Sequence, residues 1–345
     1  MNNPDQRKLS KRIHGGPDRE GVPTYDFSSN ANGMGTPDFI LNAIQQASFR
    51  YYPDPEYFKL RQCLATKHQV DPERVLIAGS ASEFIYRITS YIARGILCNT
   101  QNASPTVWFP EHCYGDYQNA AATWQLVSTK MIMEADLVWL CDPSSPLGRP
   151  LENINNLIAS LSHKQIAVLD LAYEPLRLEG HLALNQSELD LVWQMWSPNK
   201  ALGITGIRGA YIIGPSNSQR IIQELNSMAS SWVLGAHGVE MLSIWADSRS
   251  KDWLNQSLEI LHKWKLSQIE VCNQIGWLPL HSVSNFFCVN PQRKNLSDYQ
   301  SQLRNHGIKL RDTSSFGLPN HFRLAVMSPA TQSILLNVAL SIGKE

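Results

Sequence analysis

The sequence of 345 residues has no excess of charge of either sign, since 30 Lys and Arg residues balance 30 Asp and Glu residues. A nucleic-acid-binding protein normally shows a basic excess, and a disordered chain has few hydrophobic residues, whereas this chain is 43% hydrophobic. It also lacks a run of about 18 apolar residues, the length of a membrane-spanning helix, and an apolar segment after its polar N-terminus. We therefore expect a folded, cytoplasmic protein that binds neither nucleic acid nor membranes.

The chain also lacks the patterns of metal sites and disulfide frameworks. Its cysteines are far apart, with no Cys-x-x-Cys pair and no histidine at zinc-ligand spacing. His112, His237 and His281 have no partners at regular spacing either, which predicts core or solvated side chains. We expect no metal site and interpret the six cysteines as small buried hydrophobic residues: Cys63, Cys98, Cys113, Cys141, Cys272 and Cys288.

Three common motifs of nucleotide-binding and hydrolytic enzymes do not occur. The sequence contains neither the G-x-G-x-x-G of dinucleotide-binding dehydrogenases nor the G-x-x-x-x-G-K-[ST] of nucleoside triphosphatases. The G-x-S-x-G turn of α/β hydrolases is also missing. These three classes of enzyme are therefore excluded.

Short apolar runs alternate with longer amphipathic stretches over residues 30–245. Apolar runs of strand length indicate strands buried on both faces, and the alternation is typical of a mostly parallel, mixed sheet flanked by helices. This predicts an α/β fold with a large ligand-binding domain. The expected strands are 75–78, 106–109, 137–141, 166–169, 191–196 and 210–213, and the expected helices are 83–97, 113–124, 151–163 and 219–228.

The pattern changes after residue 246. A long amphipathic helix over 252–275 is followed by a strand at 285–289, a helix at 296–306, a strand at 322–326 and a closing helix. This order suits a smaller α+β domain. We expect residues 1–29 and 246–345 to form it together.

Polar or glycine-rich residues follow the predicted strands at their carboxyl ends, where open α/β sheets bind ligands. Ser80, Ala81 and Ser82 open a predicted helix, whose N–H groups can hold a phosphate. Asp170 and Lys200 follow two other strands. Pyridoxal 5′-phosphate needs this combination, because its aldehyde takes a lysine, its ring nitrogen a carboxylate and its phosphate hydroxyl and N–H groups. The sequence therefore predicts this cofactor.

Seven segments spread over the chain carry a family resemblance: His14-Gly-Gly, Asp26-Phe-Ser-Ser-Asn30, Tyr52-Pro-Asp-Pro, Asp170-x-Ala-Tyr173, Asn199-Lys200-Ala-x-Gly-x-x-Gly-x-Arg208, Gly307-Ile-Lys-Leu-Arg311 and Phe322-Arg323-Leu. In this order they resemble the fold-type I pyridoxal-phosphate enzymes, in the class I/II aminotransferase family. Within it they resemble the branch of histidinol-phosphate aminotransferase and of threonine-phosphate decarboxylase from cobalamin synthesis. The resemblance implies a homodimer.

The resemblance also implies a role for each matching residue. Lys200 binds the cofactor covalently, Asp170 pairs with the ring nitrogen, and Tyr173 bonds the ring hydroxyl. Tyr114 stacks on the ring, and the substrate meets Asn30 and Arg323, with Arg311 as a second anion clamp or a structural ion-pair partner of an acid such as Asp312. The phosphate contacts are Ser80, Ala81, Ser82, Ser197 and Arg208, with Tyr52 supplied by the neighbouring subunit.

The chain departs from the family pattern at two places. Ser145 stands where the family has an asparagine that donates to the ring hydroxyl, so as a cofactor contact it makes a longer or water-mediated bond, or none. Asn199 replaces the serine that commonly precedes the lysine, which weakens the expectation of a phosphate contact there. These departures keep a non-catalytic, ligand-binding relative as an alternative.

The reaction depends on which bond at the substrate's Cα is broken. Loss of the proton, with Lys200 as acid and base, gives transamination with a 2-oxo acid as second substrate, whereas loss of carbon dioxide gives decarboxylation. We expect an aminotransferase that acts on a small anionic amino compound. The decarboxylase is the alternative that His14-Gly-Gly and the late Ser-Phe-Gly-Leu-Pro favour.

Overall fold

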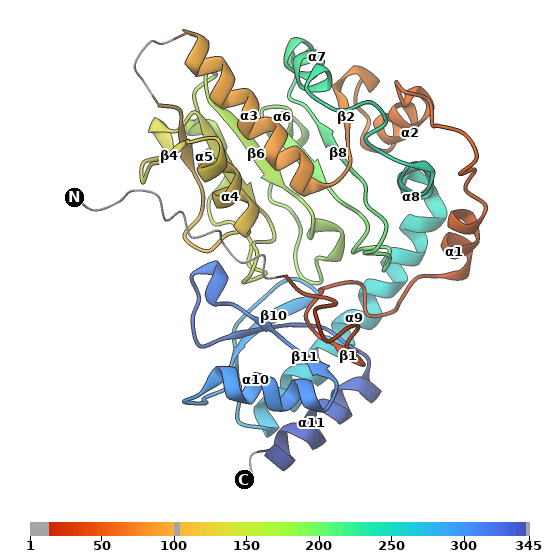
Figure 1. Ribbon diagram of the computed structural model, residues 1–345, viewed down its shortest axis with the longest axis vertical. Helices are drawn as coiled ribbons and strands as arrows, with labels where there is room; N and C mark the ends of the chain where they lie inside the picture. The colour runs from red at the N-terminus through yellow and green to blue at the C-terminus, as the bar shows by residue number, and fades with distance from the viewer. Residues whose placement is uncertain (1–13, 100–103, 343–345) are drawn as a thin grey trace.

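The computed structural model describes residues 14–99 and 104–342. The first 13 residues of the predicted small domain therefore lie outside the described residues. The described residues form three sheets with helices around them: a seven-stranded sheet in the upper part of Figure 1, and a four-stranded sheet and a two-stranded pair in its lower part.

The larger sheet has seven strands in the order β2-β8-β7-β6-β5-β3-β4. All neighbouring pairs are parallel except those of β8, which is antiparallel to both β2 and β7. This confirms the predicted mixed, mostly parallel sheet. The strands are β2 (Val75–Ala78), β3 (Thr106–Trp108), β4 (Val127–Ser128), β5 (Leu137–Cys141), β6 (Ile166–Asp170), β7 (Trp193–Trp196) and β8 (Ala210–Ile213).

Helices cover both faces of this sheet, so successive residues of a strand enter different cores. On β5, Leu137 and Trp139 pack with α3, α4 and α7, whereas Val138 and Leu140 pack with α5 on the opposite face. The helices of this part are α1 (Asp38–Gln45), α2 (Phe58–His68), α3 (Ala81–Asn99), α4 (Gly115–Thr123), α5 (Ile154–Ser160), α6 (Gln186–Leu189), α7 (Gln219–Ser227) and α8 (Ala236–Ala246), with the 3₁₀ turns η1 (Pro72–Arg74), η2 (Ile132–Glu134) and η3 (Glu174–Leu176).

The smaller sheet is antiparallel, in the order β12-β13-β10-β9. The long helix α9 leads into this part, and Figure 1 shows it running from the larger part to the smaller one. The elements are α9 (Ser248–Gln274), β9 (Leu278–Pro279), β10 (Phe286–Asn290), α10 (Leu296–Asn305), β11 (Ile308–Lys309), β12 (Arg311–Asp312), η4 (Ser314–Phe316), β13 (Phe322–Ala325) and α11 (Pro329–Ile342).

An N-terminal segment joins the two parts. Its strand β1 (Tyr25–Asp26) pairs in parallel with β11, and Phe27 continues the contact by accepting a hydrogen bond from Ala325 of β13. Five residues later the main-chain N–H of Asn32 donates to the carbonyl of Lys200 at 2.9 Å. This segment therefore fixes the smaller sheet against the turn that follows β7.

Most predicted elements agree with the structure within a few residues, but two expectations are wrong. The helix predicted over 151–163 is only Ile154–Ser160, because Asn153 has a left-handed φ of +53° and the chain becomes extended at Leu161. Cys63 is exposed on the outer face of α2, so it is not a core residue. The cysteines at 113, 141, 272 and 288 are buried as predicted, and the side chain of Cys98 lies outside the described residues.

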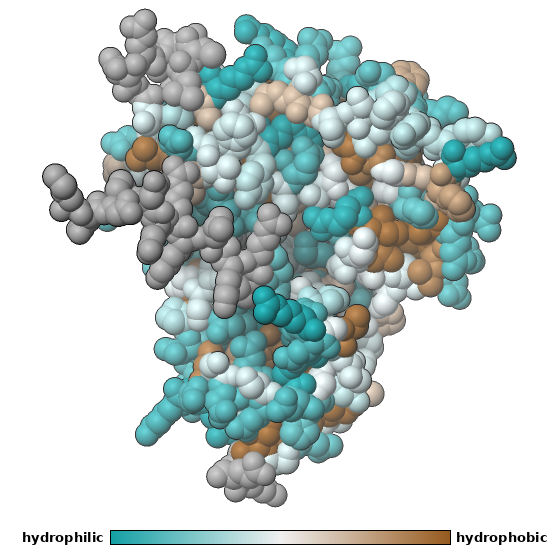
Figure 2. Space-filling view, viewed as in Figure 1, coloured by the Kyte–Doolittle hydropathy of each residue, from teal (hydrophilic) through white to brown (hydrophobic). Residues whose placement is uncertain are grey.

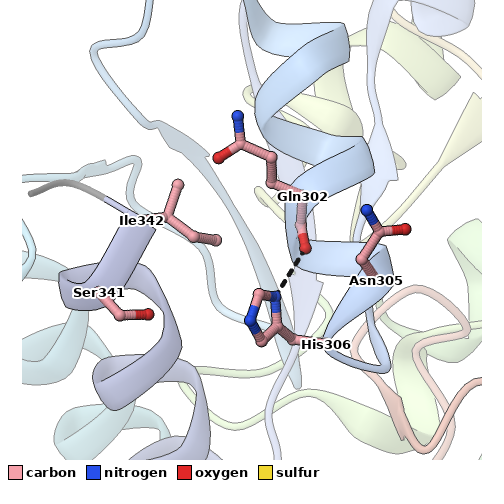
Figure 3. A pocket seen from close by; sticks show the side chains of 5 residues that line it. All are labelled: Gln302, Asn305, His306, Ser341 and Ile342. Atoms are coloured by element: carbon pink, nitrogen blue, oxygen red, sulfur yellow. Dashed lines mark hydrogen bonds between the residues drawn. The ribbon is translucent and has the colours of Figure 1, made fainter. Parts of the chain in front are cut away.

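A small hollow of about 140 Å³ lies between the C-terminal ends of α10 and α11. In Figure 3 the His306 ring turns back onto its own helix, where Nδ1 donates to the carbonyl of Gln302 at 3.0 Å. The lining of the hollow includes no acid, lysine or arginine, and we assign the hollow no function. The lining residues are Gln302, Asn305, His306, Ser341 and Ile342. None of the helices in the described part of the chain is long and apolar enough to cross a membrane.

Candidate active site

Asp170 is the last residue of β6 and lies at the carboxyl end of the larger sheet, in register with Cys141 of β5 and Met195 of β7. It is 6% exposed. One carboxylate oxygen accepts a 2.5 Å hydrogen bond from the hydroxyl of Tyr117, and the other accepts one from the N–H of Ala172. Burial raises the pKa of Asp170, and the two donors and the charge of Lys200 oppose that rise. Such a carboxylate is suited to a cationic donor.

Lys200 lies in the turn after β7, and its Nζ is 5.1 Å from the centre of the Tyr173 ring. The hydroxyl of Tyr173 accepts a 3.3 Å hydrogen bond from the side-chain amide of Asn30. Asn30 is fully buried at a φ of +56°, a conformation that asparagine tolerates better than most residues. The structure therefore places the predicted residues Asp170, Lys200, Tyr173 and Asn30 around one point.

The N-terminus of α3 contributes a second group of predicted residues. Ala81 and Ser82 are the first residues of the helix, whose N–H groups have no acceptor inside it. The Ser80 hydroxyl accepts from the N–H of Glu83 and so caps the helix. The Ser82 hydroxyl is 3.2 Å from that of Tyr114, whose pKa is raised by burial. This end of α3 offers N–H and hydroxyl donors to an anion.

Ser197 and Asn199 precede Lys200 in the same turn and are both buried. The Ser197 hydroxyl has no hydrogen-bond partner among the described residues. The Asn199 amide points to the carbonyls of Thr205 and Ile207, at 3.4 Å each. Asn199 therefore closes the turn that carries Lys200, whereas Ser197 has its donor available.

Two buried arginines come from the smaller sheet. Arg311 on β12 and Arg323 on β13 are direct partners across the antiparallel pair. Arg323 donates to the Ser145 hydroxyl at 3.2 Å, and its Nε is buried without a partner among the described residues. Arg311 donates to the main-chain carbonyl of Asp312 and to the hydroxyl of Ser315. Burial and the charge of Arg323 lower the pKa of Arg311 to about 10.

Ser145 belongs to a loop after β5 that a buried ion pair anchors. Asp142, the first residue of this loop, pairs with Arg177, which also binds Glu174 at 2.7 Å. Ser145 is 5% exposed, and its hydroxyl accepts a hydrogen bond from Arg323. The residue that departs from the family pattern thus contacts the arginine in this structure.

Two predicted residues lie at the surface. The side chain of Arg208 is exposed. Tyr52 is 77% exposed, and its ring stacks on that of Trp232, with 4.4 Å between the ring centres. The next residue, Val233, lies beside Gly79 at the start of α3. Tyr52 is therefore at the outer rim of the same end of the sheet.

Sequence reasoning missed three aromatic residues that shape this site. Tyr117 donates to Asp170, while Phe286 and Phe316 lie against the guanidinium of Arg323, at 5.4 and 5.2 Å from its Cζ to the ring centres. Tyr117 is one helical turn after Tyr114 in a correctly predicted helix, so its place on the buried face was a usable signal. Nothing in the sequence alone connected Phe316 to the arginines.

The chain is similar to known proteins over most of its length. The sequence profile of the family described as "Aminotransferase class I and II" matches residues 23–338. A histidinol-phosphate aminotransferase of Rhodopseudomonas palustris is 21% identical, over 92% of this chain and 90% of the relative.

Two solved structures share the fold. An L-threonine-O-3-phosphate decarboxylase from Porphyromonas gingivalis has a TM-score of 0.77 at 19% identity, over 92% of this chain and 99% of the other. A histidinol-phosphate aminotransferase from Sinorhizobium meliloti, in complex with pyridoxal-5′-phosphate, has a TM-score of 0.74 at 20% identity, over 91% and 90%.

We predict that Tyr117→Phe destabilises the folded protein by about 1–3 kcal/mol, because a buried carboxylate oxygen loses its donor. The pKa of Asp170 should rise further, since one of the groups that lower it is gone. The new ring retains the stacking of Tyr117 on Trp139, so the change isolates the hydroxyl. Urea unfolding at neutral pH measures the loss. Tyr114→Phe, whose hydroxyl contacts Ser82 instead, is the matched control, and equal stability of the two variants would contradict the prediction.

Proposed function

The chain belongs to the aminotransferase class I and II family, and from this premise we propose that it transfers the amino group of a small anionic amino compound to a 2-oxo acid. The proposed substrate class rests on one observation, the pair of buried arginines Arg311 and Arg323 on the smaller sheet. A carboxylate and a phosphate are the groups that guanidinium binds best. Histidinol phosphate, the substrate in the name of the relatives, has one such group.

Pyridoxal 5′-phosphate is the cofactor of this family and is present in the Sinorhizobium meliloti structure. The residues of this chain fit it. Asp170 is a buried carboxylate whose pKa is raised by burial, so a protonated ring nitrogen is a favourable partner. Within residues 14–99 and 104–342, Asn30 Oδ1 and Ser197 Oγ are buried without a hydrogen-bond partner, so both atoms can serve polar groups of the cofactor.

We assign the residues that would hold the cofactor from the family resemblance. Lys200 would bond it covalently, Asp170 would pair with the ring nitrogen, and Tyr173 would donate to the ring hydroxyl. Tyr114 would stack on the ring. The phosphate would be held by Ser80, Ala81, Ser82, Ser197 and Arg208, and by Tyr52 of a second subunit. Of these, Ser80 already caps α3, and Arg208 has to turn inward from its exposed position.

The bound cofactor supplies a cationic ring that draws electrons from the substrate's Cα. The chain's own residues do the rest. Arg323, with Asn30, holds the substrate's anion and so decides which bond at Cα faces the ring. The Nζ of Lys200, once released, accepts and returns the Cα proton as general base and acid. Buried Asp170 keeps the ring nitrogen charged throughout.

Decarboxylation of threonine phosphate is a second candidate. The similarity in fold to the Porphyromonas gingivalis decarboxylase supports it, as does the fact that threonine phosphate carries two anions, a carboxylate and a phosphate, for the two arginines. The hydroxyl of Ser145 accepts a hydrogen bond from Arg323, the arginine proposed to bind the substrate. This contact gives the serine a role in a catalytic site and argues against a non-catalytic relative.

We place the enzyme in the cytoplasm, with a cofactor-binding domain over 30–245 and a smaller domain over 1–29 and 246–345.

The experiment that tests the function mixes cofactor-loaded protein either with histidinol phosphate and 2-oxoglutarate or with threonine phosphate alone. We predict glutamate formation in the first mixture and no carbon dioxide in the second. Arg323→Met should raise KM about 100-fold, because a charge-assisted contact is lost. Carbon dioxide release without glutamate would establish the decarboxylase instead. Neither product from loaded protein would establish the non-catalytic relative.

A homodimer is the second part of the proposal. Several large side chains near Tyr52 in the sequence are exposed, and Figure 2 shows hydrophobic residues on the side of the molecule where α1, α2 and α8 lie. Exposed aromatic side chains are enriched at protein interfaces. The members of this aromatic patch are Phe49, Tyr51, Tyr52, Phe58 and Trp232.

Sedimentation should therefore give twice the chain mass of 38.9 kDa. In a dimer with shared sites, Tyr52→Phe weakens cofactor retention without changing the mass, because only a hydroxyl is removed. Phe58→Leu, within the same patch, is the control that leaves retention unchanged. A monomer with full activity would refute the shared site.

A further inference from the structure

We propose that Phe316, held by His112, is the positioning residue that keeps Arg311 and Arg323 apart as two separate anion-binding groups. The inference rests on the proposed function, since it assigns a role within the same substrate site. Phe316 follows β12 in the short turn η4, and His112 comes from the other part of the molecule, in the loop after β3.

The two arginines would not take up this arrangement unaided. They are direct partners across β12 and β13, so both side chains leave the same face of the sheet. Arg311 is 4% exposed and Arg323 6%, so water screens their repulsion little. The lowered pKa of Arg311 reflects that repulsion as well as burial. A group that attracts both cations at once therefore stabilises the pair.

The ring of Phe316 supplies this favourable contact. The Cζ of Arg311 lies 4.7 Å from the ring centre, and the Cζ of Arg323 lies 5.2 Å from it. An aromatic face attracts a guanidinium without using its N–H donors or neutralising its charge. A carboxylate in the same place would occupy the N–H donors of the guanidinium and neutralise its charge. The aromatic contact therefore stabilises two buried cations and leaves them able to bind substrate anions.

The loop that carries Phe316 is tightly closed. The hydroxyl of buried Thr313 lies 2.6 Å from the carbonyl of Leu318 and 2.8 Å from that of His321, so its single proton serves one of them at a time or is shared by both. Gly317 follows the ring at a φ of +74°, a conformation that residues with a Cβ adopt at a cost. The hydroxyl of Ser315, next to Phe316, accepts a 2.7 Å bond from Arg311. The ring is thus fixed relative to both arginines.

His112 connects this loop to the cofactor side of the site. Its Nδ1 donates to the carbonyl of Phe316 at 3.1 Å, although the two residues are 204 positions apart. His112 is also two residues before Tyr114, whose hydroxyl contacts Ser82 at the start of α3. The contact therefore sets the distance between the arginine pair and the residues proposed to hold the cofactor.

The test is a calorimetric titration of inorganic phosphate into cofactor-loaded protein, in which the cofactor's own phosphate site is filled. Arg323→Met identifies the signal that comes from the arginine pair. We expect Phe316→Leu to weaken phosphate binding about tenfold, and Phe316→Tyr to stay within about threefold of the wild type, because it keeps the ring. His112→Ala should weaken binding about threefold, and His112→Asn, which keeps a donor, should restore it.

His321→Ala is the matched control, since this half-buried histidine also bonds a main-chain carbonyl of the same loop, but that of Pro319 and not that of Phe316. Thermal unfolding confirms that each variant folds. In turnover, Phe316→Leu should raise KM for the amino substrate more than it lowers kcat.

Unchanged phosphate binding in Phe316→Leu, or equal losses in the Leu and Tyr variants, would overturn the proposal. The titration does not depend on turnover. If neither histidinol phosphate nor threonine phosphate reacts while Phe316→Leu still weakens phosphate binding, the proposed function fails and the positioning role stands.

Discussion

The burial of the Asp170 carboxylate at the end of β6 is the constraint on which the rest of the site depends. A charge removed from water costs several kcal/mol unless donors and an opposite charge replace the lost solvation. Tyr117, Ala172 and Lys200 supply these in part, and each comes from a different segment of the larger sheet's rim. The same requirement explains why the hydroxyl of Tyr117, whose role was not predicted from the sequence, is buried beside this carboxylate. It also explains why a cationic ring is the ligand that such a carboxylate suits.

The second constraint is that the N-terminal segment connects the smaller part of the molecule to the carboxyl end of the larger sheet. The N-terminal segment bonds both β11 and the turn of Lys200, so Asn30 reaches Tyr173 while its neighbours stay paired with the smaller sheet. The arginines enter from that smaller sheet, through contacts to Ser145 and to the loop of Phe316. The residues proposed to hold the cofactor therefore come from one part of the molecule, and the arginines proposed to bind the substrate come from the other. A change in the relative position of the two parts alters the distance between the substrate's anion and Lys200.

Much of this arrangement could be predicted from the sequence, because apolar runs buried on both faces define strands with little ambiguity. The runs at 75–78, 137–141 and 210–213 are strands with the predicted bounds. Helix ends were less certain, since a single left-handed residue such as Asn153 ends the regular structure without changing the hydrophobic pattern. Contacts between distant segments were out of reach. The bond from His112 to Phe316 spans 204 positions and leaves no periodic signal, and a solvated or core histidine was the expectation. Arg208 and Tyr52 were placed by resemblance alone and lie at the surface of the single chain.

The central claim is that Lys200, set beside Asp170 and Tyr173, bonds pyridoxal 5′-phosphate covalently. Borohydride reduction of cofactor-loaded protein, followed by peptide mass spectrometry, tests it most directly. We predict that visible absorbance is lost on reduction and that the cofactor's mass appears on Lys200 alone, while Lys200→Ala protein takes up no label. A colourless protein after soaking with the cofactor, or a label on a different lysine, would contradict the account.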